Sequence, residues 1–140
     1  MQRTVLLASV LLVSFLPVAG ANSLPALPEQ DGTVFIAAQQ WKGAPGPRNI
    51  KVYIHYPGDA LGNVGAKTGL MLSLHNGGGT FHSGTASPER LANRFDVVAI
   101  CTDYLQSGKW RETKRPYDFG YLQALDALRA LHYVFAGLNR

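Results

Sequence analysis

The sequence has a single cysteine, Cys101, in 140 residues, so no disulfide can form within the chain and the fold depends on its apolar core. Cys101 ends an apolar run, where a buried and unreactive thiol is expected. Charged residues are also few, at 16% of the chain. The formal net charge of +4 is too small to indicate a nucleic-acid partner or an anionic membrane surface.

Long apolar runs are absent except for one near the start, from Val5 to Val18. Serines and Pro17 interrupt it, and it falls short of the roughly 20 apolar residues that a membrane-spanning helix needs. Arg3 precedes the run and small residues ending at Ala21 follow it, which is the pattern of a cleaved secretory signal. We therefore expect residues 1–21 to be a signal peptide and the mature chain to be secreted or periplasmic, without a membrane anchor.

No feature typical of a nucleic-acid-binding protein accompanies the basic residues. No aromatic stacking platform or known module goes with the densest cluster, so a solvated loop is the simpler interpretation. The chain also lacks internal repeats, a heptad pattern, and the Gly-Lys-Ser or Gly-Lys-Thr of a phosphate-binding P-loop. The cluster consists of Lys109, Arg111, Lys114 and Arg115.

The first part of the mature chain predicts a leader and two extended segments. Residues 22–32 are rich in proline and small residues and indicate a flexible leader. Residues 33–39 are mostly apolar. Asn49–Tyr56 alternates between apolar and polar side chains, which is the pattern of an antiparallel strand with one wet face.

The second part has the pattern of a parallel sheet with helices. Gly69–Leu74 and Val97–Cys101 are continuous apolar runs, which predict strands buried on both faces. Between them, Ser87 is a natural N-cap for a short helix. A longer helix is predicted at about residues 117–135, with Gly137 as its terminator. The expected apolar face of this helix consists of Leu122, Leu125, Leu128, Leu131 and Phe135.

This order of elements predicts an α/β fold in one domain, residues 33–140. An antiparallel strand pair comes first, and a parallel strand–helix–strand–helix unit follows. If strands and helices continued to alternate, another strand would come next, but only Leu138, Asn139 and Arg140 remain. We therefore expect an incomplete sheet in which the strand at residues 69–74 has one edge without a neighbour.

A cluster of glycines follows directly after that strand, in the run His75, Asn76, Gly77, Gly78, Gly79. Consecutive glycines cost backbone entropy, so they are kept where the backbone approaches a ligand or adopts positive φ. A loop at the carboxyl end of a parallel strand lines the crevice in which open α/β sheets bind ligands. Its free N–H groups can face a developing negative charge, as acyl transfer requires.

The run from His75 to Gly79 resembles the histidine- and glycine-containing oxyanion loop of α/β-hydrolase esterases and lipases. The segment from Val97 that ends in Asp103 and Tyr104 is similar to the next strand of that fold, and this pair is expected to stabilise the turn there. Within the superfamily, the pattern is closest to prolyl-oligopeptidase-like peptidases and related secreted esterases. The resemblance covers roughly residues 49–135. It implies a serine hydrolase acting on a small ester or peptide substrate, with no cofactor.

The resemblance also implies which catalytic groups are missing. In that family the nucleophile elbow G-x-S-x-G follows the next strand, and the acidic residue and the catalytic histidine come later. No serine of this chain lies in such a motif, so we expect an N-terminal portion that is inactive alone, its C-terminal half missing. Asn76 departs from the commonest form of the loop. Gly78 and Gly79 are the expected N–H donors, and His75 is expected to orient the loop.

Two other interpretations stay open. The chain is a non-catalytic fragment in one, and a dinucleotide-binding module in the other. Gly77 and Gly79 match the first two glycines of a dinucleotide motif, but the third position falls on His82 and the expected helix begins only near Ser87. No metal is expected, because no recognised ligand spacing links His55, His75, His82 and Asp103.

Overall fold

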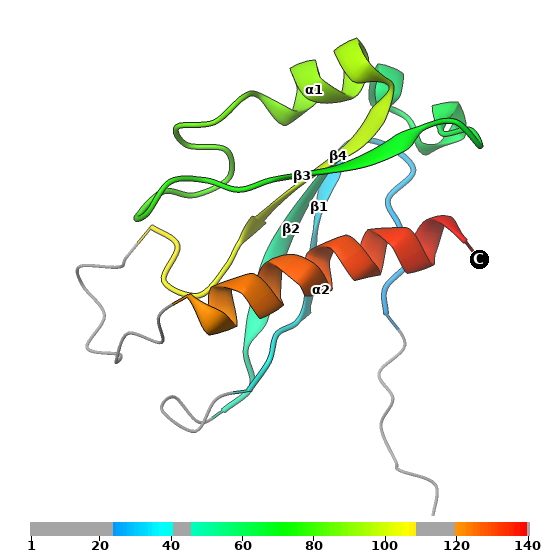
Figure 1. Cartoon of the computed structure of the whole chain (residues 1–140). Helices are drawn as coiled ribbons and strands as arrows, with labels where there is room; N and C mark the ends of the chain where they lie inside the picture. Colours follow the sequence, from blue (N-terminus) through cyan, green and yellow to red (C-terminus); the bar gives the residue numbers. More distant parts are fainter. Residues whose placement is uncertain (1–23, 41–45, 109–119, 140) are drawn as a thin grey trace, which may run out of the picture.

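The computed structural model describes residues 24–40, 46–108 and 120–139, which form a four-stranded sheet with two α-helices (Figure 1). The expected signal peptide and the basic cluster at residues 109–115 lie outside the described residues. The elements in chain order are β1 (Gly32–Ala37), β2 (Asn49–His55), the short 3-10 turns η1 (Pro57–Asp59) and η2 (Leu61–Asn63), β3 (Gly69–Ser73), α1 (Pro88–Phe95), β4 (Val97–Asp103) and α2 (Tyr121–Leu138).

The sheet has the strand order β1-β2-β4-β3. Strand β2 is antiparallel to both β1 and β4, and β3 is parallel to β4. The expectation of an antiparallel pair followed by a parallel unit is therefore confirmed. Strand β3 lies at the edge, and no described strand pairs with its outer side. For this reason β3 is only partly buried instead of buried on both faces, and Leu74 just after it is 44% exposed.

The main core lies on one face of the sheet, and α2 lies across that face (Figure 1). The alternation in β2 decides which side chains enter it, because successive side chains of a strand point to opposite faces. Ile50, Val52 and Ile54 are fully buried, as the sequence pattern predicts, whereas Lys51 and Tyr53 point to the other face. The core partners from β4 and α2 are Val98, Ile100, Ala130, Tyr133 and Val134.

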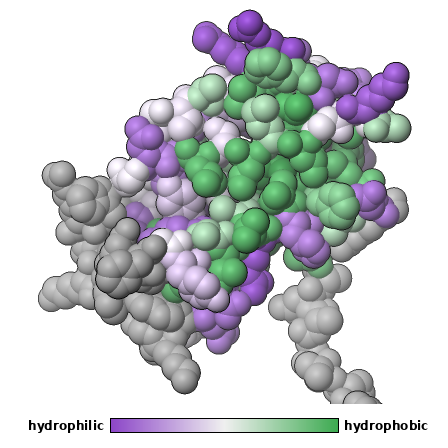
Figure 2. All heavy atoms as spheres, in the orientation of Figure 1, coloured by the Kyte–Doolittle hydropathy of each residue, from purple (hydrophilic) through white to green (hydrophobic). Residues whose placement is uncertain are grey.

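The predicted apolar face of helix α2 is only partly buried: Leu122 is buried and Leu131 packs against the core. Leu128 and Phe135 were expected in the core, but they are 57% and 56% exposed. Small residues such as Ala127 and Ala130 face the sheet instead, and they let the helix approach it closely. Figure 2 shows the resulting apolar surface over α2 and β3. The buried residues of α2 are Leu122, Asp126, Ala127, Ala130, Tyr133 and Val134.

The ends of α2 also differ from expectation. Residues 117–119 of the predicted helix lie outside the described residues, and the helix begins at Tyr121. It does not end at Gly137 but continues to Leu138. The glycine is needed for packing, because a Cβ at Gly137 would lie 2.6 Å from Cγ of Leu27.

Replacing Gly137 by alanine is therefore expected to lower the free energy of unfolding by about 1–3 kcal/mol through overpacking. In an exposed helix the same change would stabilise by about 1 kcal/mol. Urea denaturation measures the difference. The double variant Gly137→Ala with Leu27→Ala should recover part of the loss, and a stabilised single variant would contradict the packing explanation.

The segment before β1 is packed against the domain, although residues 22–32 were expected to be a flexible leader. The hydroxyl of Tyr56 donates to the Pro28 carbonyl at 2.9 Å, and the hydroxyl of Tyr133 donates to the Ala26 carbonyl at 2.9 Å. Leu24 and Leu27 pack against the core cluster. The domain therefore begins earlier than residue 33.

Helix α1 begins as the sequence predicts. The Ser87 side chain caps it by accepting the N–H of Arg90, and Pro88 occupies the first turn. The helix ends at Asp96, which is left-handed with φ of 50°. It connects β3 to β4 and packs against β4, β2 and η1.

Candidate functional site

Two loops meet at the carboxyl edge of the parallel strands. The glycine loop, residues 75–84, follows β3, and a second loop, residues 104–108, follows β4. Because β3 and β4 are parallel neighbours, both loops leave the same edge of the sheet. The N–H of Gly108 donates to the Gly79 carbonyl at 2.8 Å and joins them directly. Ligands bind at this edge in open α/β sheets.

His75 is held firmly at the base of the glycine loop. It is only 4% exposed, and its ring stacks on Tyr104 at 4.1 Å between centroids, with 17° between the ring planes. The Tyr104 hydroxyl donates to the His75 carbonyl at 2.7 Å. Burial, followed by the Asp103 charge, raises the pKa of Tyr104, so the phenol stays protonated and remains a donor. These contacts fix His75 at the base of the glycine loop.

The hydrogen bonds of His75 define its tautomer. Its Nδ1 lies 2.8 Å from the Asn76 carbonyl oxygen, which can only accept, so Nδ1 must carry the hydrogen. In the neutral ring Nε2 is then an acceptor, and the Ser107 hydroxyl donates to it at 2.7 Å. No local pattern predicts this contact, because it joins side chains 32 positions apart.

The backbone of the glycine loop corrects one of the two expected donors. The N–H of Gly79 donates to the Asn76 carbonyl at 2.9 Å, so it is not free for a ligand. A Cβ at Gly79 would lie 2.8 Å from Cβ of Ser83, which explains the glycine by packing. Within the part of the chain that the structure describes, the N–H groups of Gly77 and Gly78 have no partner. Gly78 has φ of 79°, a conformation that favours glycine. The available donors are therefore Gly77 and Gly78.

Asp103 holds the second half of the glycine loop, which lies beyond the turn that Asp103 was expected to stabilise. One carboxylate oxygen accepts the N–H of Phe81 at 2.8 Å, and the other accepts the Tyr53 hydroxyl at 2.8 Å. Phe81 has φ of 54°, which is strained for an aromatic residue. Its ring packs on Tyr53 at 4.5 Å between centroids. Asp103 thus holds the loop against the sheet.

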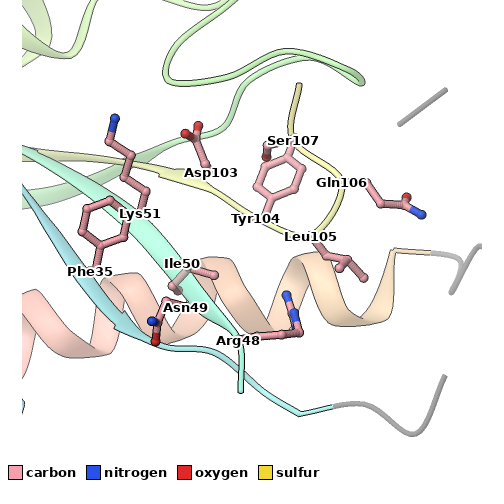
Figure 3. Close-up of a pocket in the computed structure, with 10 residues that line it drawn as sticks. All are labelled: Phe35, Arg48, Asn49, Ile50, Lys51, Asp103, Tyr104, Leu105, Gln106 and Ser107. Carbon is pink, nitrogen blue, oxygen red and sulfur yellow. The ribbon is translucent and has the colours of Figure 1, made fainter. Parts of the chain in front are cut away.

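An open groove of about 440 Å³ lies beside these loops (Figure 3). Its exposed apolar side chain is Phe35 on β1, whereas Ile50 and Leu105 line it from buried positions. Lys51, Asp103, Tyr104 and Ser107 add polar groups. The exposed lining of the groove is therefore more polar than apolar.

A buried ion pair supports the floor of the groove. Nη2 of Arg48 lies 2.6 Å from Oδ2 of Asp126 on α2. The same oxygen accepts the N–H of Leu105 at 3.0 Å. Burial raises the pKa of Asp126, and the Arg48 and Leu105 interactions oppose that rise. Arg48 is thus neutralised, whereas Lys51 makes no ion pair with any described residue.

The remaining histidines and the cysteine take no part in this site. His55 is partly buried and pairs with Asp31 at 2.6 Å. His82 is also partly buried and packs on Phe81. Among the described residues no three His, Cys, Asp or Glu are arranged to hold a metal ion. Burial raises the pKa of Cys101 to about 11, so the thiol is buried and protonated, as predicted.

The glycine loop does not lead into a helix N-terminus. Residues 80–87 separate Gly79 from α1, whose first turn is capped by Ser87. A dinucleotide motif places the pyrophosphate against a helix N-terminus, and the described geometry lacks that arrangement.

Comparison with family models, with curated proteins and with solved structures finds no match. In the described part of the chain, no helix has the length and apolar character needed to cross a membrane.

Proposed function

We propose that this chain forms the first part of a secreted serine hydrolase of the α/β-hydrolase type, which acts on an ester or peptide bond. Its contribution is the oxyanion loop at Gly77 and Gly78. The elbow serine, the acidic residue and the catalytic histidine come from outside these 140 residues, because no G-x-S-x-G occurs among them.

The strand order supports this proposal at the level of the fold. The described sheet joins an antiparallel β1-β2 pair to parallel strands β3 and β4, and this is the arrangement of elements on which the resemblance to α/β-hydrolases rests. The connection from β3 to β4 through α1 agrees as well.

The observation that carries the proposal is the pair of unpartnered N–H groups at Gly77 and Gly78. They lie on a loop that His75 and Tyr104 hold rigidly at the carboxyl edge of the sheet. When a serine attacks a carbonyl carbon, negative charge develops on the carbonyl oxygen. Preorganised N–H donors stabilise that charge without reorganising, and loss of one such donor lowers kcat by about 100- to 1,000-fold.

The product of the complete gene tests the proposal. We expect it to hydrolyse p-nitrophenyl esters and to be labelled by a fluorophosphonate. In that product, Gly78→Ala should lower kcat by about 100-fold with little change in KM, because alanine is strained at φ of 79° and shifts the donor.

Gly46→Ala is the matched control for this substitution. Gly46 also has positive φ, at 120°, and a Cβ there would meet nothing within 4 Å. It therefore tests backbone strain away from the loop. A complete product without esterase or peptidase activity, or equal losses in the two variants, would overturn the proposed function.

A further inference from the structure

Ser107 and His75 have the geometry of a nucleophile and its base. The Ser107 hydroxyl lies 2.7 Å from Nε2 of His75, within the 2.6–3.2 Å reach that identifies such pairs. The Asn76 carbonyl binds Nδ1 at 2.8 Å and fixes the tautomer with a bare Nε2. A base needs this tautomer in order to take the serine proton.

The backbone presents Ser107 to the groove. Its neighbours Gln106 and Gly108 both have positive φ, at 70° and 73°, so the chain turns sharply on each side of the serine. Its N–H donates to the Tyr104 carbonyl at 3.0 Å and holds the turn. Ser107 is partly exposed and lines the groove of Figure 3.

We propose that Ser107 is a nucleophile activated by His75, and that it accepts acyl groups from esters bound in this groove. Ser107 Oγ attacks the carbonyl carbon, and its proton moves to Nε2 of His75. When the tetrahedral intermediate collapses, the carbon–oxygen bond to the leaving alcohol breaks and His75 returns the proton to that alcohol. The product is an ester on Ser107.

The glycine loop is joined to the loop that carries Ser107, because the N–H of Gly108 donates to the Gly79 carbonyl at 2.8 Å. In this proposal the unpartnered N–H groups of Gly77 and Gly78 are the donors for the oxyanion. Phe35 is 64% exposed and is the apolar side chain that the groove presents, which suits a short acyl group.

This activity needs no residue from outside the chain, so it goes beyond the proposed function and does not depend on an elbow serine. It departs from the expectation that the chain is inactive alone, because the contact between Ser107 and His75 supplies a nucleophile that does not depend on the missing serine. Nδ1 of His75 is bonded to the neutral carbonyl of Asn76. A neutral carbonyl stabilises the imidazolium less than a carboxylate at the same place would. We therefore expect one acylation event per chain and slow release of the acyl group.

The purified chain is treated with a fluorophosphonate probe and, separately, with p-nitrophenyl butyrate. We expect one equivalent of nitrophenol in a burst and one covalent adduct on the peptide that contains Ser107, located by mass spectrometry. Ser107→Ala should abolish both. Ser87→Ala is the matched control, because the Ser87 hydroxyl lies outside the glycine loop, accepts the N–H of Arg90 and has no imidazole partner among the described residues.

His75→Gln should slow the acylation of Ser107 by about 100-fold, the usual contribution of a general base. His75 is buried, so circular dichroism must first establish that the His75→Gln variant folds. If this variant does not fold, Ser107→Ala alone tests the proposal. A folded chain without an adduct, or an adduct that persists in Ser107→Ala, would overturn the proposal. Adduct mapping separates this outcome from the test of the complete gene product, where an elbow serine would carry the label.

Discussion

Replacing Asp126 by alanine is expected to lower the free energy of unfolding by about 3–5 kcal/mol, because the change leaves the Arg48 guanidinium buried without its partner. Asp126 is fully buried, and Arg48 lies 2.6 Å from it. The N–H of Leu105 also loses its acceptor. Equilibrium urea denaturation, followed by circular dichroism, measures the loss.

The double variant Arg48→Met with Asp126→Leu is the control. It removes both charges and fills the space with apolar atoms, and such replacements of buried ion pairs are often neutral or stabilising. We expect it to recover most of the stability of the single variant. If Asp126→Ala costs less than about 1 kcal/mol, the buried pair of Arg48 and Asp126 does not stabilise the fold.

The same residue makes stability depend on pH with a defined sign. Burial raises the folded-state pKa of Asp126 above its ordinary value of 3.8, more than Arg48 and Leu105 lower it. The folded state therefore binds this proton more tightly, and the contribution of Asp126 is most favourable below pH 3.8. It declines as the pH rises through the folded-state pKa. The stability of the native chain relative to Asp126→Asn should thus be higher at pH 4 than at pH 7; the reverse order would mean that Arg48 dominates.

The second large effect is expected at Ile100, in the central strand β4. Ile100 is fully buried, pairs with Ile54 and Leu72 on the two sides, and belongs to the core cluster. Ile100→Ala should cost about 2–5 kcal/mol, from lost burial and the cavity left behind. Leu128→Ala is the matched comparison and should cost less than about 0.5 kcal/mol, because Leu128 is exposed on α2. Similar losses at the two positions would contradict the described orientation of α2.

The orientation of α2 illustrates what sequence periodicity leaves open. Leu122 and Leu131 of the predicted apolar face do contact the core, but Leu128 and Phe135 are exposed. Ala127, Ala130 and Val134 are buried beside them, because small residues allow close contact with the sheet, and the Tyr133 hydroxyl donates to the Ala26 carbonyl. Gly137 was predicted to end the helix, but α2 continues past it. The glycine is needed for packing, because Leu27, distant in sequence, occupies the space beside it.

The candidate site also has one part that the sequence predicts and another that depends on the tertiary structure. The location of the glycine loop could be predicted, because it depends on a strand followed by local backbone chemistry. The contact between His75 and Ser107 could not, since it depends on two loops meeting at one edge of the sheet. The reassignment of the donors from Gly79 to Gly77 also required the turn hydrogen bond to Asn76.

The sequence by itself determined the strands, the cap of α1, the buried cysteine and the position of the glycine loop, because alternation, capping and glycine conformation act over a few neighbouring residues. Only the tertiary structure decided that β3 is an edge strand, which face of α2 is buried and which side chains surround His75. These features depend on contacts between residues tens of positions apart, whose packing and hydrogen bonds form only when the sheet and its loops come together.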